Sequence, residues 1–167
     1  QSRAVTMTKQ MIQIESTDPG TYENAMADWI TTQLAPYPNV RLSRQEVLPG
    51  RPNLIAELTG DPSLPALVMI CHMDTVVVGD GWTLPPFDAI EKDGKIYGRG
   101  ACDMKSGLAC CLSAFQYAAE TLQTSGKTPK QTLKLICSMD EEDFMRGSEA
   151  CIQAGWVKDH DWGIDAE

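Results

Sequence analysis

The first third of the chain combines helical and extended patterns of apolar residues. Apolar positions recur every three or four residues in segments 5–13 and 22–34, a spacing that places them on one face of an α-helix. Two prolines then end the second helical pattern. Segments 40–47 and 53–58 follow, separated by a Pro-Gly pair, and we expect a strand in each.

The remainder of the chain continues to interleave strands with helices. The unbroken apolar run 66–71 is typical of a strand that is buried on both faces. The other predicted elements are a hairpin over 88–97 that turns at Asp93-Gly94, helices over 104–120 and 148–154, and strands over 132–139 and 162–166. Strands alternating with helices predict an α/β fold, a sandwich with a largely parallel sheet.

Composition narrows the class of protein further. The 167 residues are 43% hydrophobic, enough for one globular domain with its own core, and no apolar run approaches the ~20 residues of a membrane-spanning helix. The net charge of -9 and the lack of a Lys/Arg cluster argue against nucleic acid as a partner. The acidic excess serves solubility, supplies metal ligands, or does both.

Six cysteines raise the question of disulfides. Cys71 and Cys137 lie in apolar strand patterns, Cys110 and Cys111 are neighbours on a predicted helix, and no C-x-x-C pair occurs. Buried reduced thiols behave as small hydrophobic groups. We therefore expect free cysteines and a cytoplasmic location.

The strongest chemical signal is His72, which directly follows the buried strand 66–71. Ligands bind at the carboxyl ends of the strands in α/β sheets. Asp74, two residues on, is placed to accept the ring N–H of His72 and so orient it. A histidine satisfied by a nearby carboxylate without any metal is the simpler alternative. The other histidine, His160, lies in a polar stretch, where we expect it to be solvated.

Three further acidic features follow predicted strands or precede a helix. Asp103 lies just before the helix 104–120, Glu141 and Glu142 follow the strand 132–139, and Glu167 follows the last strand. Each has a plain explanation alone: a helix N-cap, a solvated loop and a chain terminus.

Together these acidic groups and the histidine indicate a metal site. The carboxyl ends of parallel strands share one edge of a sheet, so the groups can converge there. One imidazole with several carboxylates suits zinc, cobalt or manganese. Two adjacent glutamates allow one to bind metal while the other acts as a base.

Three motifs carry a family resemblance: His72-Met73-Asp74, Gly98-Arg99-Gly100-x-x-Asp103-x-Lys105 and Asp140-Glu141-Glu142. In their order and spacing, these motifs resemble those of the co-catalytic zinc hydrolases. The resemblance covers nearly the whole chain, from the Ser16 region to Glu167. That family includes acetylornithine deacetylase, succinyl-diaminopimelate desuccinylase, aminoacylase and carboxypeptidase G. The resemblance implies a zinc-exopeptidase-like three-layer α/β/α sandwich with a mixed, largely parallel sheet.

The resemblance also implies residue roles. His72 and Glu167 would bind the first of two divalent ions, most simply zinc, with cobalt or manganese as alternatives. Asp103 would bridge both ions and Glu142 would bind the second. Asp74 would orient His72, and Glu141 would be the general base. The peptide between Asp103 and Met104 is expected to be cis.

The implied reaction is hydrolysis of an amide bond in an N-acyl amino acid or small peptide, through a water that bridges the two metals. Similar enzymes have a late second histidine and an inserted dimerisation domain, so residues 1–167 are expected to be the N-terminal portion of one catalytic domain. We expect this portion alone to be inactive and the full-length protein to be a homodimer.

Two alternatives to this reaction come from other classes of function. One is a metal-binding or regulatory fragment of the same fold without catalysis. The other is a cysteine hydrolase that uses Cys71 or Cys102 near His72. Cys71 is adjacent to His72 in the strand and should face away from it, which disfavours the second alternative.

Overall fold

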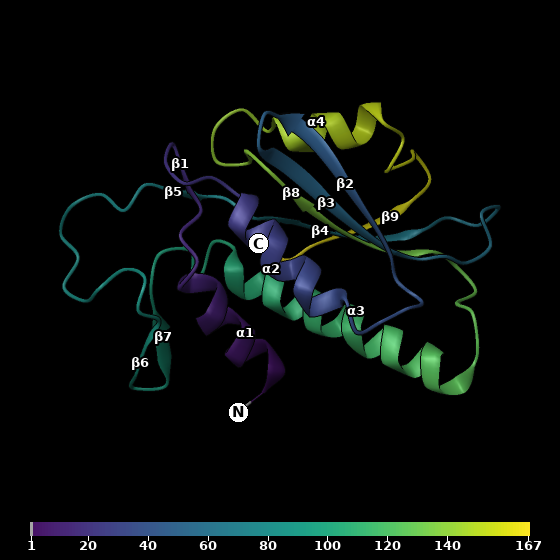
Figure 1. Cartoon of the computed structure of the whole chain (residues 1–167), viewed down its shortest axis with the longest axis horizontal. Helices are drawn as coiled ribbons and strands as arrows, with labels where there is room; N and C mark the ends of the chain where they lie inside the picture. Colours follow the sequence, from purple (N-terminus) through teal and green to yellow (C-terminus); the bar gives the residue numbers. More distant parts are fainter. Residues whose placement is uncertain (1) are drawn as a thin grey trace.

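A five-stranded mixed sheet forms the centre of the molecule in the computed structural model, which describes residues 2–167. Its strand order is β2-β3-β8-β4-β9 (Figure 1). The strands are β2 (Arg41–Leu48), β3 (Arg51–Leu58), β4 (Leu67–His72), β8 (Leu133–Ser138) and β9 (Trp162–Asp165). β3 is antiparallel to both its neighbours, and the other four strands share one direction. The carboxyl ends of β4, β8 and β9 therefore meet at the same edge.

Helices cover the two faces of this sheet unequally. One face carries α1 (Arg3–Ile12), α2 (Asn24–Leu34) and α3 (Lys105–Ser125), and the main apolar core lies between them and the sheet. The opposite face carries α4 (Arg146–Gln153), which packs through Cys151 on a smaller apolar cluster (Figure 1). The layers are thus helix, sheet and helix, which confirms the predicted sandwich.

Two short strand pairs lie outside the main sheet. The hairpin of β6 (Ile90–Lys92) and β7 (Lys95–Tyr97) turns at Asp93-Gly94, as the sequence predicts. The parallel pair of β1 (Thr17–Asp18) and β5 (Thr75–Val76) was not expected, because two-residue strands leave no periodic pattern. This second pair ties the segment after α1 to the segment just beyond His72.

The expected and observed bounds differ at one strand and one helix. All eight residues of β3 are buried, so the strand begins two residues before its apolar pattern, at Arg51. α3 runs past the expected end at residue 120 and stops at Gly126, whose φ of 64° is left-handed. Each of the six cysteines is free, as expected.

Within residues 2–167, no helix is both long and apolar enough to cross a bilayer.

Candidate metal centre

His72 ends β4 with its ring buried and its two nitrogens in different surroundings. Nδ1 lies 2.9 Å from the backbone carbonyl oxygen of Asp74. A carbonyl oxygen only accepts hydrogen bonds, so Nδ1 carries a proton, and in the neutral ring Nε2 is the nitrogen left to bind a metal. The nearest Asp74 carboxylate oxygen is 3.7 Å from Nδ1. The expectation that the Asp74 side chain accepts this N–H is therefore corrected: its main chain does so.

Nε2 of His72 faces a carboxylate. It lies 3.0 Å from Oδ1 of Asp103, whose side chain is 55% exposed. Two groups that both present lone pairs face each other favourably only with a proton or a cation between them. The peptide between Asp103 and Met104 is cis, as expected.

The Asp74 carboxylate has another partner, the turn that follows β8. Its two oxygens accept the backbone N–H groups of Glu141, at 3.1 Å, and Glu142, at 2.9 Å. Asp74 is fully buried, and it thereby links the loop after β4 to the loop after β8. This link brings both glutamates to the sheet edge where His72 lies.

The ligand atoms form two groups that share His72. In one group, atoms of His72, Asp103 and Glu142 all lie within 4.8 Å of one another; in the other, atoms of His72, Glu141 and Glu167 do. The resemblance instead implied Glu167 and Asp103 together on the first ion. The predicted residues thus converge around His72, and its Nε2 lies 3.0 Å from Asp103 and 3.8 Å from Glu141.

Crowding of like charges in this cluster alters its acid–base behaviour. Burial lowers the pKa of His72, but the carboxylates of Asp74, Asp103 and Glu141 outweigh this and raise it above the usual range. Burial raises the pKa of Glu141, and the nearby Glu167 adds to the rise. A divalent cation would relieve this repulsion, so the donor set fits a metal.

Glu142 and Asp74 respond to the same environment. Burial raises the pKa of Glu142, and the carboxylate of Asp103 raises it further. Burial also raises the pKa of Asp74, although the hydrogen bonds that Asp74 accepts from two backbone N–H groups offset part of this rise. The cluster therefore holds four titratable groups whose proton affinity is increased in the absence of a cation.

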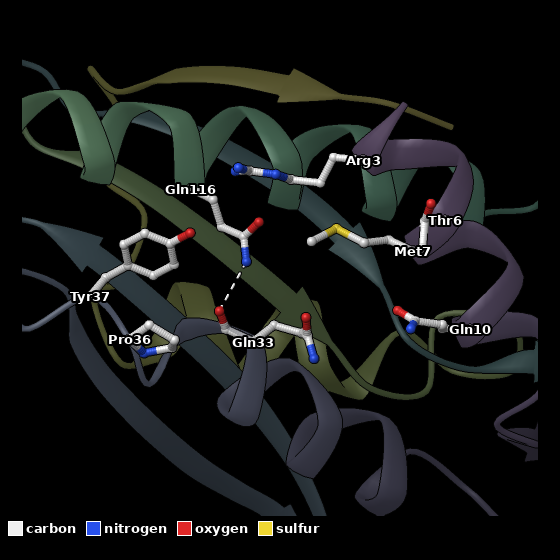
Figure 2. Close-up of a pocket in the computed structure, with 8 residues that line it drawn as sticks. All are labelled: Arg3, Thr6, Met7, Gln10, Gln33, Pro36, Tyr37 and Gln116. Carbon is white, nitrogen blue, oxygen red and sulfur yellow. Dashed lines mark hydrogen bonds between the residues drawn. The ribbon is translucent and has the colours of Figure 1, made fainter. Parts of the chain in front are cut away.

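Two cavities differ in their suitability for chemistry. A small one of about 60 Å³ is lined by His72, Glu141 and Glu167 among others, so it belongs to the cluster. A larger hollow of about 380 Å³ lies between α1, the end of α2 and α3 (Figure 2). Among the described residues, its walls carry Arg3, the hydroxyls of Thr6 and Tyr37 and three glutamines, and no carboxylate or histidine. We therefore place the site at the cluster.

Other carboxylates gather nearby around Asp18, one set with Glu23 and Asp74 and another with Asp140 and Asp143. Apart from Asp74, which bonds the backbone of Glu141 and Glu142, these carboxylates are paired with arginines. Arg51 contacts Asp18 and Glu23, and Arg146 forms a two-pronged ion pair with Asp140 at 2.5 and 2.6 Å. These sets are charge-paired networks next to the candidate metal cluster.

The sequence analysis did not identify three buried polar residues behind the site: Glu23, Arg51 and Asn53. The signal available for Arg51 and Asn53 was the Arg51-Pro52-Asn53 segment at the start of the predicted strand, and Glu23 left none. Two other sequence predictions hold: His160 is exposed, and Cys71 interacts with Cys111 of α3 on the face of the sheet that carries α1, α2 and α3.

The fold and the cluster define the class: an α/β/α domain with imidazole and carboxylate groups gathered at the carboxyl edge of its sheet. The chain belongs to peptidase family M20/M25/M40, whose family model matches residues 68–167. That stretch contains every residue of the cluster.

Curated relatives agree with this family. A probable succinyl-diaminopimelate desuccinylase of Staphylococcus aureus is 39% identical over 119 residues, which are 70% of this chain and 28% of the relative. The succinyl-diaminopimelate desuccinylase of Gluconacetobacter diazotrophicus is 46% identical over 92 residues, 54% of this chain and 22% of its own. The chain thus spans less than a third of the length of these relatives.

Solved structures show the same fold. The M20 family metallo-carboxypeptidase Sso-CP2 from Sulfolobus solfataricus aligns with a TM-score of 0.76 at 21% identity, over 99% of this chain and 37% of that protein. Aminopeptidase PepT from Bacillus cereus aligns with a TM-score of 0.72 at 22% identity, over 99% of this chain and 43% of that protein.

Proposed function

We propose that the protein of which this chain is part is a metal-dependent hydrolase of the amide bond in a small N-acyl amino acid or peptide. The observation that carries the proposal is the position of Nε2 of His72, 3.0 Å from Oδ1 of Asp103, with Glu141, Glu142 and Glu167 around it. Membership of a peptidase family supports amide hydrolysis as the reaction.

Two divalent cations are the proposed cofactor, with zinc as the first choice and cobalt or manganese as alternatives. His72 and Glu167 would hold one, Glu142 the other, and Asp103 would bridge them, as the resemblance implies. Bound there, the cations would polarise the amide carbonyl and lower the pKa of an attacking water that bridges them.

Glu141 is the proposed general base. It lies in the cluster but is partly exposed, and its Oε2 is 3.8 Å from Nε2 of His72. Its carboxylate accepts a proton from the attacking water and then delivers it to the nitrogen of the leaving amine as the C–N bond breaks. Asp74 holds the main chain of Glu141 and accepts no proton in this scheme.

The proposed substrate class follows from the named relatives. The two curated relatives are named succinyl-diaminopimelate desuccinylase, one of them as probable, so an N-succinyl amino acid is the first substrate to test. N-acetyl amino acids and dipeptides are the next. A homodimer in the cytoplasm remains our expectation for the full-length protein, and sedimentation analysis would test the dimer.

The test is Glu141→Gln in the full-length protein. We expect the variant to bind zinc as wild type does and its kcat to fall about 10²–10⁴-fold, because the base is removed and the ligands remain. Glu149→Gln, an exposed position on α4, is the matched control and should retain normal turnover. Near-normal turnover of E141Q with zinc bound would contradict the base assignment. Zinc binding without any turnover by the wild type would instead favour the non-catalytic alternative.

A further inference from the structure

The turn that carries Glu141 and Glu142 is held from behind by side chains from distant segments. The backbone N–H of Met139 donates to Oδ1 of Asn53 at 3.0 Å. The backbone N–H of Asp140 donates to Oε1 of Glu23 at 3.1 Å. With the two N–H groups that Asp74 accepts, four consecutive backbone donors over 139–142 each bond to a side chain of another segment.

Glu23 is itself fixed by a buried arginine. Nε of Arg51 donates to Oε2 of Glu23 at 2.9 Å, and Nη2 donates to Oε1. The same Nη2 lies 2.5 Å from Asp18 and 3.3 Å from Asp140, and the guanidinium stacks 4.1 Å from the ring of Tyr22. Glu23 is 0% exposed and Arg51 is 7% exposed. Water therefore competes little for these bonds.

The backbone held in this way has an unusual conformation. Asp140 has a φ of 62°, in the left-handed region that a residue with a side chain adopts only when its surroundings hold it there. Its N–H reaches Glu23, its carbonyl oxygen accepts from Met145 at 2.7 Å, and its carboxylate accepts from Arg146. The direction in which Glu141 leaves the turn depends on this conformation.

We propose that Glu23 and Arg51 are positioning residues that hold the Asp140 turn so that Glu141 and Glu142 reach the metal cluster together. The inference rests on the proposed function, because it gives these glutamates their roles. Metal ligands and bases must be held within about 0.5 Å of their working geometry, and groups behind them provide that precision.

The chemistry of the pair fits this role better than packing alone. Glu23 presents one oxygen to both the Arg51 fork and the Asp140 N–H, so the neutral amide of Gln would put a donor in place of one acceptor or weaken both bonds. Lysine at position 51 would keep the charge but lose the planar fork that reaches Glu23 with two nitrogens.

The experiment uses Glu23→Gln in the full-length protein with Zn²⁺ as the probe. Zinc affinity is measured by competition with a chromogenic chelator, exchange of the amides 139–142 by hydrogen–deuterium exchange, and kcat and KM with the N-succinyl substrate. We expect zinc binding weaker by about 10–100-fold, faster exchange of the Asp140 amide, and a loss in kcat larger than any change in KM.

The matched control is Glu57→Gln, at the opposite end of β3. Glu57 is also buried and ion-paired, with Arg41 at 3.0 Å and Lys134 at 4.0 Å, but it does not contact the Asp140 turn. This variant should lose stability without losing zinc affinity or speeding exchange of the amides 139–142. An equal loss of zinc affinity in E57Q and E23Q would overturn the proposal, since any buried ion pair would then have the same effect.

The outcomes separate this proposal from the proposed function. A folded E23Q with wild-type zinc affinity and kcat overturns the positioning role and leaves the hydrolase intact. Weakened zinc binding in E23Q, with a wild type that hydrolyses none of the substrates, supports positioning and overturns the hydrolase. If E23Q does not fold, Arg51→Lys is measured: lower stability with unchanged zinc affinity overturns the proposal, and a loss of both supports it.

Discussion

Lys105 offers a test of the structure through the pH dependence of stability. The residue begins α3, is 1% exposed, and donates from Nζ to the backbone carbonyl oxygen of Ile14 at 2.7 Å. Burial lowers the pKa of Lys105 from 10.5 to about 8, although the carboxylate of Glu15 offsets part of the effect. The perturbation is Lys105→Met, which keeps the apolar length of the side chain and removes its charge.

The size and sign of the effect follow from this pKa. The folded state binds the Lys105 proton less tightly than the unfolded state, so the group's contribution to stability is complete above about pH 10.5 and is lost as the pH falls through about 8. At about 1.4 kcal/mol per pH unit, the protonated side chain costs the folded state about 3 kcal/mol at neutral pH. Between pH 7 and pH 10, about 2.5 kcal/mol of this cost should disappear.

The assay is urea unfolding of the metal-free, full-length protein in a chelating buffer at pH 7, 8, 9 and 10. The quantity to follow is the unfolding free energy of wild type minus that of K105M. This difference cancels the buried thiols of Cys137 and Cys151, whose raised pKa values make stability fall as the pH rises above about 9. We expect it to rise by about 2.5 kcal/mol.

One variant and one result decide the Lys105 test. Lys127→Met, at an exposed position, controls for the loss of one positive charge. A wild-type minus K105M difference that stays constant within about 0.5 kcal/mol from pH 7 to pH 10 would refute the reasoning, because Lys105 would then not be buried as a cation.

Three other perturbations test the core, the turn and the chemistry. Phe115→Ala, at a fully buried position, should lower the unfolding free energy by about 3–5 kcal/mol in urea titrations. Gly147→Ala should lower the unfolding free energy by about 1–3 kcal/mol, because its Cβ would overlap the backbone oxygen of Met139. Gly163 has open space around it, so Gly163→Ala is the control and should change the unfolding free energy by under about 0.5 kcal/mol. Chelation should abolish hydrolysis and zinc should restore it, while iodoacetamide, which can reach the exposed Cys102, should leave it intact; the reverse pattern would support a cysteine hydrolase.

The local part of the site was accessible from sequence alone. His72 could be placed at a sheet edge because the run before it is apolar on both faces, and Glu141 and Glu142 could be placed there for the same reason. These inferences need only the direction of a strand and the point where its apolar pattern stops. The helix and strand positions followed from the same periodicity.

The role of Asp74 shows where local reasoning stops. Its spacing from His72 suggested a carboxylate bonded to the imidazole, but the main-chain carbonyl of Asp74 makes that bond. The carboxylate bonds the backbone of Glu141 and Glu142 instead, 67 and 68 positions away along the chain. Sequence spacing indicates which groups are near, and it does not indicate which atoms of a residue face each other.

The sequence by itself determined the order of the longer strands and helices, the burial of β4 and β8, and the types of side chain available at the carboxyl edge of the sheet, because each depends on residues within one turn or one strand. Tertiary structure alone decided that Glu23 would reach the N–H of Asp140 across 117 positions and that Asn53 would reach Met139 across 86. Such bonds depend on how the sheet brings remote segments together, and no periodic pattern records them. The positions of the two glutamates at the cluster rest on those remote bonds.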